Sequence, residues 1–156
     1  MLLAATLHEW LMFLHILAAM IWLGGGVAVT VLVGEVLRSG KHDAVARFVG
    51  SLRVIGPSTL GPASLAVLGF GIWLVLDSAA WDFGQAWIIL ALAVVAASFV
   101  VGGVVVGRAA IGARRAAEAG DDREAVRQLR RWSWGMRLIL VLLLVATWDM
   151  VFKPGF

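Results

Sequence analysis

Four long apolar stretches separated by charge-rich connections run through this sequence of 156 residues. A helix that crosses a bilayer needs about 20 consecutive, mostly apolar residues. The chain is 62% hydrophobic, whereas soluble domains are roughly half apolar. The surplus apolar side chains must face lipid, so the sequence predicts an integral membrane protein with the lipid bilayer as its first partner.

The basic residues predict how the chain is oriented in the membrane. Twelve of the thirteen Lys and Arg residues lie in two clusters, at residues 38–53 and 108–137, and Lys153 is the exception. Each cluster joins two apolar stretches, and basic connections remain cytoplasmic. We therefore expect a multi-pass protein of the bacterial inner membrane, with both termini and the turn at residues 77–82 outside. This topology and anionic lipids explain the positive charge without nucleic acid.

The boundaries of the apolar stretches predict an all-α fold, an antiparallel four-helix membrane bundle that forms a single domain over residues 1–156. Capping boxes that begin at Thr6, Asp82 and Asp121 stand at predicted helix starts. Prolines and glycines between Gly56 and Pro62 predict a kink in the second helix. The predicted helices cover about residues 7–37, 43–76, 83–119 and 122–152.

Two further patterns concern helix packing and the membrane surface. Gly103 and Gly107 form a Gly-x-x-x-Gly pair, which lets membrane helices approach closely. Packing within the bundle is the commoner use of this spacing, and a homodimer contact is the alternative. Tryptophans at the outer surface typically form an aromatic belt, for which the sequence offers Trp10, Trp81, Trp87 and Trp148.

Several classes of function are excluded or disfavoured. The chain has no cysteine, which rules out disulfides, iron–sulfur clusters and thiol chemistry. No phosphate-binding loop, Ser-His-Asp set or zinc signature is present. The spans contain few polar residues, and Glu35 is the only carboxylate that a transport path would offer, which disfavours ion-coupled transport. Whether the protein is an enzyme is left open.

His15 is the strongest candidate for chemistry, because polar residues inside a span are often functional. It follows His8 by seven residues on the same helix face, so roughly 10 Å separates the two residues along the axis and they cannot ligate one ion together. One arrangement is a haem b between the helices, with His15 as an iron ligand, alone or with a methionine. In the alternative, His15 only ties helices together through a backbone carbonyl or an indole N–H.

The haem arrangement assigns further residues to a pocket. Glycines would leave room for a flat ring, and Arg suits the carboxylate of a propionate. The predicted cofactor-binding residues are therefore His15, Trp22, Gly24, Gly25, Gly69, Gly71, Arg53 and Arg137.

A second candidate metal site lies nearer the outer surface. His8, Met12 and Met150 fall at similar depth if the first and last helices are neighbours, with Glu9 and Asp149 close by. Imidazole and thioether ligands suit copper, particularly Cu(I). In the alternative reading the methionines fill gaps in the packing and the carboxylates are hydrated.

The first helix and the C-terminal segment resemble a known family. Residues 13–25 contain Leu-His, a hydrophobic run and Trp-x-Gly, and residues 148–155 read Trp-x-Met-x-x-Lys-Pro-Gly. Gly61-Pro62 followed by Gly-Ile-Trp-Leu at residues 71–74 fits the same pattern. These motifs resemble a bacterial family of predicted four-helix integral membrane proteins of unknown function.

The spacing His15-x6-Trp22-x-Gly24 is also distantly similar to HemJ-type protoporphyrinogen oxidases and CopD-type copper-resistance membrane proteins. The first resemblance implies a haem-binding bundle with His15 on the iron, and the second implies copper handling. The basic-aromatic run and intramembrane lysine of the former, and the further histidines of the latter, have no counterparts. We expect a haem b protein with a redox or porphyrin-handling role and a membrane redox partner. The alternatives are a packing or assembly subunit and a copper-handling protein.

Overall fold

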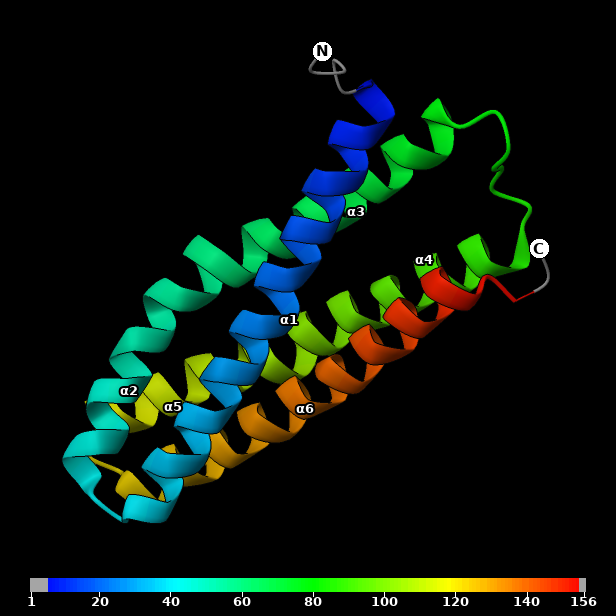
Figure 1. Cartoon of the computed structure of the whole chain (residues 1–156). Helices are drawn as coiled ribbons and strands as arrows, with labels where there is room; N and C mark the ends of the chain where they lie inside the picture. Colours follow the sequence, from blue (N-terminus) through cyan, green and yellow to red (C-terminus); the bar gives the residue numbers. More distant parts are fainter. Residues whose placement is uncertain (1–5, 155–156) are drawn as a thin grey trace.

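The computed structural model describes residues 6–154, apart from the side chains of His42 and Arg53. Within this range the chain is helical, and four continuous helices are long and apolar enough to cross a membrane (Figure 1). The predicted all-α four-helix architecture is therefore confirmed. The elements are α1 (Leu7–Ser39), α2 (His42–Ile55), the π-helical turn η1 (Gly56–Leu60), α3 (Gly61–Asp77), α4 (Ala86–Val101), the π-helical turn η2 (Gly102–Gly107), α5 (Arg108–Glu118) and α6 (Asp122–Phe152).

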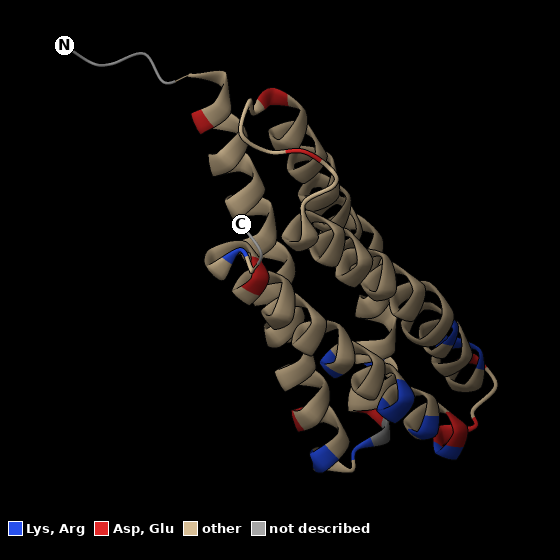
Figure 2. Cartoon of the chain, turned by 90° about the vertical axis from the view of Figure 1, so that its right-hand side faces the viewer, with Lys and Arg blue, Asp and Glu red and all other residues tan. Residues whose placement is uncertain are grey.

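The two arginine-rich connections lie at the same end of the bundle. Figure 1 places the turns after α1 and α5 together, and Figure 2 shows most Lys and Arg residues gathered there. We call this end the basic end. The start of α1, the turn between α3 and α4 and the end of α6 form the opposite end. The arrangement agrees with an antiparallel bundle, and which compartment each end faces stays a prediction.

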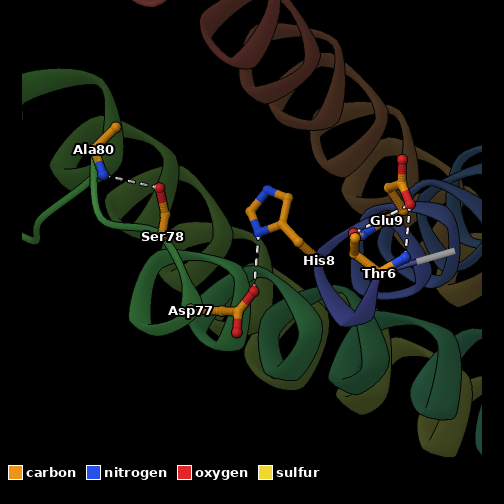
Figure 3. Close-up of polar contacts among 6 residues, drawn as sticks. All are labelled: Thr6, His8, Glu9, Asp77, Ser78 and Ala80. Carbon is orange, nitrogen blue, oxygen red and sulfur yellow. Dashed lines mark hydrogen bonds and ion pairs between the residues drawn. The ribbon is translucent and has the colours of Figure 1, made fainter.

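Helix starts are fixed by side chains in two of the three predicted cases. At α1, the Thr6 hydroxyl accepts from the Glu9 N–H at 3.3 Å, and the Glu9 carboxylate accepts from the Thr6 N–H at 2.7 Å (Figure 3). This is a complete capping box. At α6, Asp121 accepts from the Glu124 N–H at 3.0 Å, but the Glu124 carboxylate accepts from the Gln128 amide instead of the Asp121 N–H, so the predicted box is only half formed. Each bond satisfies a backbone donor that a helix start leaves free.

The capping box predicted at Asp82 is wrong. The Asp82 carboxylate accepts from the Gly84 N–H at 2.7 Å, and the Gln85 amide donates to the Ala80 carbonyl at 3.0 Å. Both side chains therefore stabilise the turn before the helix. As a result, α4 begins only at Ala86, beyond the predicted start at residue 83.

The kink predicted in the second helix is confirmed, and it takes the form of a π-helical turn. Pro57 lacks the N–H that a regular helix requires, and the Gly61 N–H bonds to the Gly56 carbonyl, closing the wider turn η1. The second such turn, η2, was not predicted. A Cβ added at Gly103 in η2 would meet no atom within 4 Å. The prediction that this glycine packs closely inside the bundle is therefore wrong, and the homodimer contact stays a prediction.

The helices pack as two pairs, α1 with α3 and α4 with α6, and contacts between α1 and α6 join the pairs. The two pairs separate away from the basic end. Helix α1 packs on α3 and α6, and α6 packs on α4 and α5. The main apolar core extends from the basic end to the middle of the bundle, and a small second cluster around Trp87 and Ile88 lies at the opposite end. Figure 1 shows α3 and α4 diverging toward the turn that joins them.

Candidate functional site

A cavity of about 460 Å³ lies between α1, α3, α4 and α6 at the opposite end, and we call it the histidine cavity. Its size falls in the range of about 300–1,000 Å³ that is usual for small-molecule sites. A side cavity of about 60 Å³ shares part of its wall. The lining is mostly apolar, and it includes His15, Trp22, Gly71, Trp81, Trp87, Thr147 and Lys153, with Met12 and Met150.

His15 occupies the wall between the two cavities. The residue is 9% exposed, and its Nδ1 is buried with no hydrogen-bond partner among the described residues. The Val67 carbonyl of α3 faces the imidazole, without reaching Nδ1 in ordinary hydrogen-bond geometry. A Cβ added at Gly71 would lie 3.1 Å from His15 Cε1 and 3.4 Å from Nδ1. Gly71 therefore lets α3 approach the imidazole itself.

Of the other predicted pocket residues, Trp22 lines the histidine cavity, with its ring 6.1 Å from that of Phe99 on α4. The predicted glycine cradle does not form. A Cβ at Gly24 or Gly69 would meet nothing within 4 Å, and both residues are exposed on the outside of the bundle. A Cβ at Gly25 would lie 3.0 Å from the side chain of Leu60, which places this glycine at a helix contact.

The arginines predicted for a propionate lie elsewhere or outside the described side chains. Arg137 is exposed, and its guanidinium lies 5.4 Å from the ring centroid of Trp134, which is itself 70% exposed. This pair points away from the histidine cavity. The side chain of Arg53 is not among those described. Of the predicted cofactor residues, the structure therefore brings His15, Trp22 and Gly71 together.

The residues of the predicted copper site are divided. Met12 and Met150 line the histidine cavity. His8 instead bonds to Asp77 at the end of α3, with Nδ1 3.1 Å from Oδ2 (Figure 3). The His8 ring centroid lies 5.7 Å from that of Trp81. Within residues 6–154, no three His, Cys, Asp or Glu side chains come together as metal ligands.

Three residues of this end were missed as site residues. Trp87 was expected in a surface belt, but it is 6% exposed, and its Nε1 has no hydrogen-bond partner in the described part of the chain. Its ring packs edge-on against Trp81 at 5.5 Å. Lys153 places Nζ 4.5 Å from the Trp81 centroid and 5.3 Å from that of Trp87. The sequence did single out Lys153, because it is the only Lys or Arg residue outside the two clusters.

Asp149 is the third missed residue, since it was expected only as a carboxylate near the copper ligands. It is 0% exposed, and both carboxylate oxygens lack a hydrogen-bond partner among residues 6–154. Burying a carboxylate without a partner is unfavourable. The opposite end therefore combines unsatisfied polar atoms from α1, α4 and α6.

A second cavity, the arginine cavity, measures about 580 Å³ and lies toward the basic end. Both π-helical turns contribute to its wall, through Gly56 and Gly107. Arg114 is its charged lining residue, and the Arg114 Nε lies 3.5 Å from the Glu118 carboxylate. Of the predicted cofactor residues, Trp22 lines this cavity as well as the histidine cavity, whereas His15, Met12 and Met150 line only the latter.

The comparisons with known proteins give one match. A family profile described as predicted integral membrane protein (DUF2269) matches residues 9–154. No curated protein and no solved structure matches the chain.

Proposed function

We propose that this chain, which belongs to the family of predicted integral membrane proteins DUF2269, binds haem b in its histidine cavity. The observation that carries the proposal is the buried His15 imidazole on the wall of a cavity of about 460 Å³, with an Nδ1 that has no hydrogen-bond partner in ordinary geometry among the described residues. An unsatisfied buried polar atom costs about 1–3 kcal/mol. Because Nδ1 lies against Gly71 of α3, a ligand in the cavity would bind the other ring nitrogen, Nε2. A metal-ligating histidine usually donates its remaining ring N–H to a carbonyl or carboxylate, and the Val67 carbonyl faces the imidazole.

The chain's own residues suit such a ligand. His15 would hold the iron through its imidazole, and Gly71 fixes how closely α3 stands behind the ring. Trp22, with the apolar lining around it, would exclude water from the bound group. Bound haem supplies a one-electron redox centre, and its potential depends on the axial ligands. Met12 and Met150 line the same cavity, so a thioether is available as a second ligand.

The proposed role is redox or porphyrin handling in the bacterial inner membrane, with the basic end in the cytoplasm and a membrane protein as electron partner. The distribution of Lys and Arg supports this orientation (Figure 2). Arg137, Gly24 and Gly69 have no part in the proposed site, because they face the outside of the bundle.

An absorbance spectrum tests the proposal. We expect a Soret band after haem-supplemented expression or after reconstitution of the purified protein with haemin. His15→Ala should abolish it, and His8→Ala, on the same helix but outside the cavity, should leave it. Far-UV circular dichroism would verify that both variants fold. A protein without a Soret band under either condition would overturn the proposal.

Two alternatives have specific support. The Val67 carbonyl beside the imidazole favours a packing or assembly subunit in which His15 only joins α1 to α3. That alternative predicts a colourless protein that His15→Ala destabilises. The presence of Met12 and Met150 in one cavity favours copper handling, although His8 is bonded to Asp77. Metal analysis of protein purified without chelators distinguishes this second alternative.

A further inference from the structure

We infer that the ligand of the histidine cavity carries an anionic group at the opposite end of the bundle, and that the Lys153 ammonium binds this group. The inference rests on the proposed haem site and names the charged end of its ligand. For haem, the propionates would face the end where α6 terminates. The sequence had predicted arginines of the basic clusters for this contact.

Lys153 is placed at the cavity by an unusual backbone conformation. It follows the last residue of α6 with φ 42° and ψ 60°, and it is the only non-glycine residue with positive φ among those described. This left-handed conformation is unfavourable for a residue that has a Cβ. Such strain is often found at functional sites. Here it ends the helix and lets Lys153 line the same cavity as His15.

The Lys153 ammonium is held by aromatic rings that leave its charge available. Nζ lies 4.5 Å from the centroid of Trp81 and 5.3 Å from that of Trp87, within the roughly 6 Å range of cation–π attraction. The two rings pack edge-on against each other, so the ammonium lies against a packed pair of indoles. A cation–π contact orients a cation without neutralising it.

The carboxylates of this end are engaged elsewhere or do not reach the lysine. Asp77 bonds to His8, and Glu9 bonds to Thr6 (Figure 3). Asp82 accepts from the Gly84 N–H. Asp149, four residues earlier on α6, makes no ion pair with Lys153. In the described part of the chain, no ion pair includes Lys153. A cation on the wall of an apolar cavity favours an anionic partner, and a ligand can provide it.

Trp87 gives independent support for an acceptor at the same place. Its indole Nε1 can only donate a hydrogen bond, and this atom is buried without an acceptor among residues 6–154. Lys153 lies over the ring of this same residue. A carboxylate beside the ammonium would offer oxygens to both donors. A wholly uncharged amphiphile would leave the ammonium unpaired.

The test compares haemin with its dimethyl ester, which lacks the propionate charges. The purified protein in a non-ionic detergent is titrated with each compound, and the Soret band and the quenching of tryptophan fluorescence give two independent Kd values. We expect the wild type to bind haemin about tenfold more tightly than the ester, as a charged hydrogen bond warrants. Lys153→Gln should lose this preference by weakening haemin alone. Lys153→Arg should retain it, and Arg137→Gln is the matched control that should change nothing.

The outcomes separate this inference from the haem proposal. A Soret band that depends on His15, with equal affinity for haemin and ester, would overturn the role of Lys153 and leave the haem site standing. Equal weakening of both ligands in a folded Lys153→Gln variant would indicate packing rather than charge recognition, and would also overturn it. Failure of both ligands to bind the wild type would instead remove the haem proposal, and the inference with it.

Discussion

At the basic end, the helices pack around apolar side chains that have no exposed surface, such as Val33, Ala113 and Leu129. At the opposite end, the bundle buries the His15 imidazole and the Asp149 carboxylate, each with an atom that lacks a partner in the described chain. Burial of apolar surface stabilises the first end. Burial of unpaired polar groups disfavours folding at the second. A fold keeps such groups most readily where they serve a ligand.

The two cavities differ in the same way, and their volumes do not decide between them. The arginine cavity is the larger, at about 580 Å³ against about 460 Å³. Its hydroxyl groups are satisfied locally, since Ser64 donates to the Gly61 carbonyl at 2.7 Å and Ser98 donates to the Val94 carbonyl at 2.9 Å. Arg114 has Glu118 as an ion-pair partner, although its Nε makes no hydrogen bond within the described residues. Among the described residues, more unsatisfied polar atoms therefore belong to the wall of the histidine cavity, through His15 and Trp87, where a ligand could bind.

Gly71→Val should have the largest effect on the histidine cavity. A Cβ at this position already lies 3.1 Å from the imidazole, and the branched methyl groups of valine would displace the ring. We expect loss of the Soret band. Gly69→Val, two residues earlier on the same helix, adds the same side chain in open space and should leave the spectrum intact. A full, unshifted Soret band in Gly71→Val would mean that His15 is not the ligand.

Leu129→Ala probes the basic end, where the expected loss is in stability alone. Truncation of a fully buried leucine costs about 2–5 kcal/mol. Leu144→Ala, on the same helix but 57% exposed toward lipid, should cost much less. Unfolding in sodium dodecyl sulfate, followed by circular dichroism, gives both free energies. If folded Leu129→Ala also lost ligand affinity, the two ends would not be independent.

The sequence was sufficient to predict the membrane-spanning helices because the bilayer permits few backbone conformations. A backbone in the bilayer must satisfy its own hydrogen bonds, so the apolar stretches became helices, and the arginine-rich connections came to one end. The Thr6 capping box and the bend after Gly56 were also predictable. The helices, the capping box and the bend each depend on residues close together in the chain.

The direction in which each side chain points was not predictable from the sequence, and these directions determine which residues form the site. Helix α4 is apolar on every side, so periodicity could not show that Trp87 points inward. The position of Arg137 along α6 did not indicate on which side of the helix its side chain lies. Packing of the bundle places it on the outside. The left-handed conformation of Lys153 redirects the chain just where helix periodicity ceases to apply.

Asp149→Asn should raise stability, in contrast to the loss at Leu129. A neutral amide of nearly the same shape removes the buried charge and leaves only neutral polar atoms unpaired, which we expect to be worth about 1 kcal/mol. Asp77→Asn is the control with the opposite sign, because its carboxylate bonds to His8 and a partly exposed pair contributes up to about 1 kcal/mol. Both are measured by unfolding in sodium dodecyl sulfate. Destabilisation by Asp149→Asn would show that this carboxylate has a partner, and the contrast between the ends would weaken.

The smallest expected effect comes from filling the larger cavity. Ala110→Leu adds volume to the arginine cavity, and Ala146→Leu adds the same volume to the histidine cavity. If unsatisfied polar atoms define the site, only Ala146→Leu should weaken haemin binding. We expect its Kd to rise about tenfold because the site is overpacked, and Ala110→Leu should leave the Kd unchanged. Equal weakening by both substitutions would mean that ligand affinity depends on the packing of the whole bundle. The ligand could then no longer be assigned to the cavity with His15.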